Sequence, residues 1–203
     1  PRAAAHPLAK PGVENNAAAI IVEGEVLQLA SINSLAGGEE IYLQVIRGKT
    51  AALFEAATRS GAMVADAPAD HIAALAVFGD ALGVAFQIID DLLDYGGVAA
   101  VIGKDIGDDF REGKATLPVL LAHARGTADE RGFWHRVIEK RDQRAGDLEH
   151  ALALMDRREA LTDTRRKAAA YVDTAIEALS ALPETPLSRA LADIAGYVVA
   201  RAY

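Results

Sequence analysis

The most informative segment of this sequence is Phe86-Gln87-Ile88-Ile89-Asp90-Asp91-Leu92-Leu93-Asp94-Tyr95. At 100° per residue, Gln87, Asp90, Asp91 and Asp94 share one face of a helix, and apolar side chains cover most of the remaining circumference. The pattern predicts a helix that is buried on nearly every side and carries a single acidic stripe.

No lysine or arginine occurs between Arg59 and Lys104, so the stripe has no cation near it in the sequence. Neighbouring carboxylates on a helix repel by roughly 0.2–0.5 kcal/mol per pair, and removing Asp91 is therefore expected to leave stability unchanged or slightly raised. A solvated helix face is one interpretation, but such faces usually include basic residues. The oxygen-only set Asp90, Asp91 and Asp94 suits Mg²⁺, which takes one or two carboxylates together with waters and phosphate oxygens. The stripe therefore predicts half of a magnesium–phosphate site.

A phosphate site also needs positively charged donors. Lys49 and Thr50 follow a glycine inside a predicted helix, and Lys104 and Lys114 lie in a segment rich in glycine and aspartate. Each lysine alone is typical of an exposed surface. Because all three stand beside glycines and flank one acidic helix, we expect them to supply the countercharge.

Composition limits the class of protein. The 203 residues are 51% hydrophobic, and 21 basic against 29 acidic side chains give a net charge of −8, which argues against a nucleic-acid partner. The sequence contains no cysteine, which excludes disulfides and thiolate sites. No uninterrupted apolar run approaches the roughly 18 residues of a membrane span. We therefore expect a cytoplasmic protein that is not integral to a membrane.

Helix signals dominate the chain, and strand patterns are scarce. Gly37 and Gly38 precede a predicted helix, Pro68 and Pro118 suit first turns, and Thr127-Ala-Asp-Glu130 forms a capping box. The predicted class is all-α, with residues 1–14 as an unassigned tail and residues 15–203 as one helical domain. The predicted helices cover residues 16–31, 39–60, 68–95, 116–125, 127 onward, 147–155, 157–182 and 186–202, with a loop over 104–114.

These motifs resemble those of the trans-polyprenyl diphosphate synthase family. The segment 86–95 is similar to the family's second aspartate-rich motif, and residues 103–109 and 112–118 are similar to its continuation. Upstream, Glu23-Gly24-Glu25-Val26-Leu27-Gln28 and Lys49-Thr50-Ala51-Ala52-Leu53-Phe54 fit the two preceding helices. The resemblance covers about residues 17–203, and the long-chain synthases that supply quinone side chains look most similar.

The resemblance implies a helical bundle of the isoprenoid synthase type, which condenses an allylic diphosphate with isopentenyl diphosphate and works as a homodimer. It implies Mg²⁺ on Asp90 and Asp91, with Asp94 acting partly through water. Lys49 and Lys104 would hold the allylic diphosphate, with Lys114 as a neighbouring cation. Thr50 and Gln87 would line the region where carbocation charge develops.

One family feature is absent from the sequence: no DDxxD or DDxxxxD motif precedes Asp90. The chain is expected to correspond to the C-terminal part of a synthase, without the N-terminal helices, and to be inactive in chain elongation by itself. Two alternatives stay open. One is a non-catalytic helical partner subunit, and the other is a magnesium–diphosphate enzyme of related fold, such as a terpene cyclase.

Overall fold

A computed structural model describes residues 13–96 and 106–201. Helices make up most of these two ranges, and no strand occurs in them, which confirms the all-α prediction. The first range contains α1 (Val13–Ser31), α2 (Gly38–Ile46), the π-helical turn η1 (Arg47–Ala51), α3 (Ala52–Val64) and α4 (Ala69–Leu93). The second range contains α6 (Asp108–Arg111), α7 (Leu117–Arg125), α8 (Ala128–Trp134), the π-helical turn η2 (His135–Glu139), α9 (Asp147–Arg157), α10 (Ala160–Ala178), the 3₁₀ turn η3 (Leu179–Ala181) and α11 (Pro186–Ala200).

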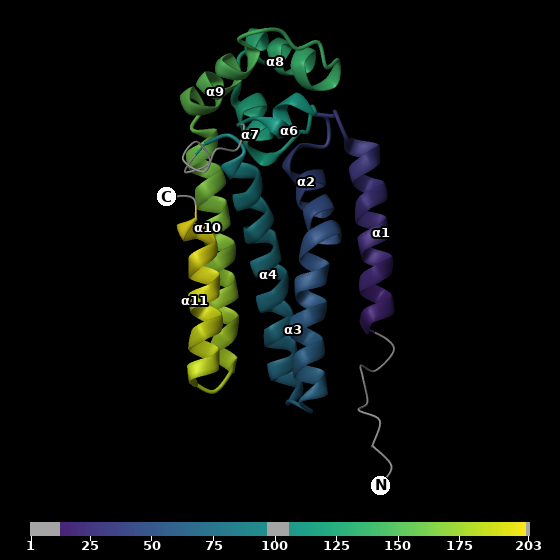
Figure 1. The fold of residues 1–203 in the computed structure, drawn as a ribbon, viewed down its shortest axis with the longest axis vertical. Helices are drawn as coiled ribbons and strands as arrows, with labels where there is room; N and C mark the ends of the chain where they lie inside the picture. The colour runs from purple at the N-terminus through teal and green to yellow at the C-terminus, as the bar shows by residue number, and fades with distance from the viewer. Residues whose placement is uncertain (1–12, 97–105, 202–203) are drawn as a thin grey trace.

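The long helices stand side by side as columns, and α6–α9 gather at one end of the molecule (Figure 1). Helix α4 is the central column, with α3 packed on one side and α10 on the other. Its Phe78, Ile88 and Ile89 are at most 1% exposed and lie in the hydrophobic core. The acidic segment predicted from the sequence therefore sits at the end of the central helix.

Helix α4 is also long and apolar enough, by length and composition alone, to cross a membrane. More than half of its most apolar window is buried inside the protein, and the core helix of a soluble protein passes the same test. Asp80 and Gln87 interrupt the apolar sequence of α4, so the helix contains no uninterrupted apolar run of membrane-spanning length.

Where local signals set a helix boundary, the structure agrees with the prediction from the sequence. Thr127 caps α8 with the complete capping box, and α7 begins after Thr116 with proline in its first turn. The prediction of a single helix over 39–60 is wrong in detail. The turn η1 divides this segment into α2 and α3, and α3 continues to Val64. The predicted helix 157–182 begins later, because Glu159 takes a left-handed conformation (φ +54°) between α9 and α10.

The predicted loop over 104–114 is also corrected. Its described part contains the short helix α6, which is flanked by Gly107 (φ +86°) and Gly113 (φ +71°). Left-handed φ values are readily accessible only to glycine, so these two residues allow a helical turn to be inserted between sharp bends. This turn places Asp109 and Lys114 beside the end of α4.

Candidate functional site

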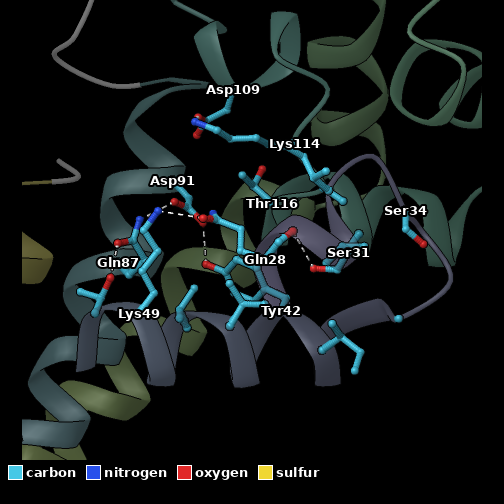
Figure 2. Close-up of a pocket in the computed structure, with 18 of the residues that line it drawn as sticks. Gln28, Ser31, Ser34, Tyr42, Lys49, Gln87, Asp91, Asp109, Lys114 and Thr116 are labelled. Carbon is cyan, nitrogen blue, oxygen red and sulfur yellow. Dashed lines mark hydrogen bonds and ion pairs between the residues drawn. The ribbon is translucent and has the colours of Figure 1, made fainter. Parts of the chain in front are cut away.

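A cavity of about 280 Å³ lies between the C-terminal part of α1, α2, η1, the end of α4 and the segment that joins α6 to α7. One part of its lining is apolar and includes Ile41, Val45, Ile46 and Leu120. The polar part includes six of the residues predicted from the sequence, namely Lys49, Thr50, Gln87, Asp90, Asp91 and Lys114. Figure 2 shows several of these side chains around Asp91.

The turn η1 carries Lys49 and Thr50 to the cavity because its backbone is approached closely from two sides. A Cβ on Gly24 of α1 would lie 2.6 Å from the backbone nitrogen of Lys49, and one on Gly83 of α4 would lie 2.6 Å from Cα of Ala51. Only glycine allows backbones to come this near. The ammonium of Lys49 donates to Oε1 of Gln28 (2.8 Å) and lies 3.3 Å from Glu25.

A chain of hydrogen bonds crosses the cavity wall from Thr50 to Tyr42. The Thr50 hydroxyl donates to Oε1 of Gln87 (2.9 Å), and Nε2 of Gln87 donates to Oδ1 of Asp91 (2.8 Å). From the other side, the Tyr42 hydroxyl donates to Oδ2 of Asp91 (2.7 Å; Figure 2). Both carboxylate oxygens of Asp91 therefore accept from neutral donors.

The three aspartates of the stripe have different surroundings. Asp91 is 7% exposed, whereas Asp90 is exposed at the cavity. Burial raises the pKa of Asp91 to about 7, and the hydrogen bonds from Tyr42 and Gln87 only partly oppose this rise. In the absence of a bound cation, the Asp91 carboxyl group thus titrates near neutral pH.

Asp94 does not belong to this cavity lining, and its side chain joins the end of α4 to α6. Its two oxygens accept the backbone N–H groups of Asp108 (3.1 Å) and Asp109 (3.0 Å) at the start of α6. Burial and the nearby charge of Asp109 raise the pKa of Asp94, although the two N–H groups oppose this. The side chain predicted as a third magnesium ligand therefore serves in this structure as an anchor for α6.

Of the two lysines predicted after α4, only Lys114 lies within the described residues. Lys114 donates to Asp109 (2.8 Å) and pairs with Glu112 (2.7 Å). Burial disfavours its charge, but these two carboxylates outweigh burial and raise the pKa of Lys114, so it stays protonated. Lys104 lies outside the described residues.

The side chains at this cavity suit an Mg²⁺ ion that is shared with a substrate. Within residues 13–96 and 106–201, no group of three histidine, cysteine or acidic side chains lies close enough to hold a metal ion unaided. Mg²⁺ typically uses one or two protein carboxylates and takes its other ligands from water and substrate phosphates. Asp90 and Asp91, which face one cavity together with Lys49 and Lys114, fit such a shared site.

Tyr42 is the site residue that the sequence analysis missed. It lies seven residues before Lys49, two helical turns away on the same face, and this spacing was the available signal. Gln28 was predicted only as part of a motif. Its contact with Lys49 could not be predicted, because it depends on the packing of α1 against η1.

An all-helical fold with this cavity is that of the isoprenoid synthase class of proteins. A solved decaprenyl diphosphate synthase from Rhodobacter capsulatus superposes with a TM-score of 0.90 at 57% identity, over 94% of this chain and 59% of that one. A polyprenyl synthase from Caulobacter crescentus CB15, solved in complex with calcium and isoprenyl diphosphate, gives 0.87 at 43% identity over 94% and 58%.

The polyprenyl synthetase family model matches residues 13–155. The chain belongs to this family, and the sequence prediction of the family is confirmed. It is 42% identical over 189 residues to the octaprenyl diphosphate synthase of Escherichia coli (strain K12), which covers 93% of this chain but 58% of the relative. The chain thus spans about half the length of the curated relatives it matches.

Proposed function

We propose that this chain forms part of the active site of a polyprenyl diphosphate synthase, a prenyltransferase that condenses an allylic diphosphate with isopentenyl diphosphate. The observation that carries the proposal is the convergence of Lys49, Lys114, Asp90 and Asp91 on one cavity whose other wall is apolar. Cations beside carboxylates are what a magnesium–diphosphate group requires, and an apolar wall suits a prenyl chain. Membership of the polyprenyl synthetase family supports the same reaction.

In the proposed reaction, the allylic C–O bond breaks and its electron pair leaves with the pyrophosphate. The double bond of isopentenyl diphosphate then attacks the allylic cation, and loss of a proton from the new adduct restores a double bond. Bound Mg²⁺ would neutralise charge on the leaving pyrophosphate. Asp90 and Asp91 would hold the metal, and Asp94 would act through water, because both of its oxygens already accept backbone N–H groups.

The other side chains bind the diphosphate and protect the cation. Lys49 would exchange its contacts with Gln28 and Glu25 for the diphosphate, together with Lys104, and Lys114 would lie nearby as a fixed positive charge. Thr50 and Gln87 would turn their oxygens toward the developing carbocation. The apolar wall would keep water from this cation, which water would otherwise capture.

The proposal includes further features that the family resemblance implies. The complete synthase would act as a homodimer in the cytoplasm, without a nucleic-acid partner, and would make long-chain precursors of quinone side chains.

Calorimetry with geranyl diphosphate tests the binding site. We expect tighter binding with Mg²⁺ than with EDTA, and weaker binding in Lys49→Gln than in the wild type. Lys140→Gln, which changes an exposed lysine outside the cavity lining, is the matched control. Equal affinity in Mg²⁺ and in EDTA would overturn the metal-assisted site.

A separate assay tests catalysis by these 203 residues. Each oriented charge at such a site contributes about 10²–10³ in rate, and the sequence has no aspartate-rich motif before Asp90 to act from the other side of the diphosphate. We therefore expect binding without incorporation of labelled isopentenyl diphosphate. Purified monomeric chain that elongates geranyl diphosphate would show that its own residues complete the site.

A further inference from the structure

Asp91 differs from the rest of the acidic stripe because a side chain from another helix, and not backbone N–H groups, holds its carboxylate. Of its two donors, Gln87 lies one turn earlier on the same helix, α4. Tyr42 belongs to α2, on the facing side of the cavity. The Tyr42 hydroxyl is thus the contact that ties the carboxylate to the facing wall.

The tyrosine is itself well fixed. Its side chain belongs to the hydrophobic core, and the residue is 8% exposed. A buried ring has little rotational freedom, so its hydroxyl holds a constant position relative to α4. The 2.7 Å contact then selects one orientation of the Asp91 carboxylate.

We propose that Tyr42 is a positioning residue for metal binding at the candidate site, acting through Asp91; this inference rests on the proposed function. A carboxylate has about four lone-pair positions, and the donors Tyr42 and Gln87 occupy two of them. The remaining positions are left for a cation, and they keep a fixed direction while Tyr42 holds the group. Residues that orient a metal ligand in this way typically change metal affinity 10–100-fold when they are mutated.

The substitution Tyr42→Phe removes only the hydroxyl and leaves the ring in the core. Tyr95→Phe is the matched control. Tyr95 is 2% exposed, and its hydroxyl contacts Thr116 (3.2 Å) rather than Asp91. The readout is calorimetric affinity for Mg²⁺ at saturating inorganic pyrophosphate in the 203-residue chain, with thermal unfolding measured in parallel.

We expect Tyr42→Phe to weaken Mg²⁺ binding about 10–100-fold, and Tyr95→Phe to change it by less than about twofold. In an Asp91→Asn background, the additional effect of Tyr42→Phe should disappear, because the positioned group is gone. Wild-type Mg²⁺ affinity in Tyr42→Phe would overturn the inference. An equal loss of affinity in both tyrosine variants would also overturn it, since that result marks a general loss of packing.

Two further outcomes are distinguishable. If wild-type protein binds pyrophosphate equally with Mg²⁺ and with EDTA, the proposed function fails and this inference fails with it. If Tyr42→Phe does not fold, 4-fluorophenylalanine at position 42 keeps the ring and fills the place of the hydroxyl with an atom that cannot donate a hydrogen bond. The same loss of about 10–100-fold in Mg²⁺ affinity is then expected, and unchanged binding would overturn the inference.

Discussion

At the scale of single residues, Asp91 combines two roles that pull in opposite directions. A buried carboxylate lowers stability when it is charged, and this effect is reflected in a pKa raised to about 7. The same burial, with Tyr42 and Gln87 as partners, keeps the group in one orientation at the cavity. The expectation that Asp91 could be removed without loss of stability is therefore replaced by a more specific prediction.

Asp91→Ala should lower the free energy of unfolding. The truncation leaves the Tyr42 hydroxyl and the Gln87 amide without their acceptor, and a buried donor without a partner costs about 1–3 kcal/mol. Urea unfolding of the metal-free protein measures the difference. Stability equal to wild type would mean that repulsion along the stripe, including that from Asp90, outweighs these hydrogen bonds.

The raised pKa of Asp91 also predicts how stability varies with pH in EDTA. Between its unfolded value near 4 and its folded value near 7, the folded protein binds the proton more tightly, so this group's contribution to stability rises as the pH falls. The limiting slope is about 1.4 kcal/mol per pH unit. Burial lowers the pKa of His123, so the contribution of His123 to stability falls as the pH falls in the same range. The informative quantity is therefore the free energy of unfolding of the wild type minus that of Asp91→Asn.

In Asp91→Asn, the Tyr42 hydroxyl can turn to accept from the amide, and the titrating group is gone. The difference in unfolding free energy between wild type and this variant should increase from pH 7 to pH 5. A difference that does not vary with pH would contradict the assignment. Below about pH 4, carboxylates with lowered pKa values, such as Asp147 beside Arg136, lose their own contribution to stability.

At the scale of elements, the turn η1 depends on glycines in neighbouring helices. Gly24→Ala would place a Cβ 2.6 Å from the Lys49 nitrogen and 2.7 Å from the carbonyl carbon of Gly48, both of which are backbone atoms. Overpacking of this kind costs about 1–3 kcal/mol. We expect lower stability and weaker Mg²⁺-dependent pyrophosphate binding, because Lys49 moves with the turn.

Gly61→Ala is the control for this prediction. Gly61 lies inside α3 with no atom within 4 Å of an added Cβ, and alanine is favoured over glycine in helices by up to about 1 kcal/mol. This variant should be slightly more stable and should bind pyrophosphate as the wild type does. Equal stability of both variants in chemical denaturation would contradict the close approach of α1 to η1.

Local signals explain which elements could be predicted from the sequence. The capping box at Thr127 and the proline after Thr116 act within a few residues, and both helix starts were placed correctly. The π-helical turn η1 was not predictable in the same way, because it is in contact with Gly24 and Gly83, which are distant in sequence. The left-handed Glu159, which separates α9 from α10, carries no composition signal.

In the candidate site, too, local patterns were predictable and contacts between distant segments were not. Periodicity put Gln87, Asp90 and Asp91 on one face, and all three line the cavity. Periodicity could not distinguish buried Asp91 from exposed Asp90, because burial depends on the packing of other helices, such as α2, whose Tyr42 contacts Asp91. Asp94 was grouped with them correctly by angle, but its partners are backbone groups of α6 that no helical pattern predicts.

At the scale of the whole molecule, α1 stands at one side of the bundle (Figure 1). One face of this helix carries a stripe of exposed apolar side chains. Val22, Val26 and Leu29 repeat at helical spacing and are each at least 60% exposed. Contiguous apolar surface of this kind marks an interaction site. We expect the purified chain to self-associate through this stripe.

The variant Val26→Lys with Leu29→Lys should shift the chain toward monomer in analytical ultracentrifugation, because two charges would be buried at the contact. Val64→Lys, at the end of α3 and similarly exposed, is the control and should leave association unchanged. An unchanged oligomer in the double variant would exclude the α1 stripe as the interface.

The π-helical turn η1 has a consequence for which codon deletions selection tolerates. Such a turn holds more residues than the α-helix around it, so loss of one codon within Arg47–Ala51 would convert it to regular helix. Because the residue lost is the surplus one, the later residues of α3 would keep their orientation about the helix axis. Phe54 and Thr58 would stay beside Gly79 of α4, so the packing of α3 against α4 would be kept. The loss would instead change the position from which Lys49 and Thr50 reach the cavity they line. Reading-frame-preserving deletions here are thus expected to be purged by selection for loss of ligand binding rather than for loss of the fold.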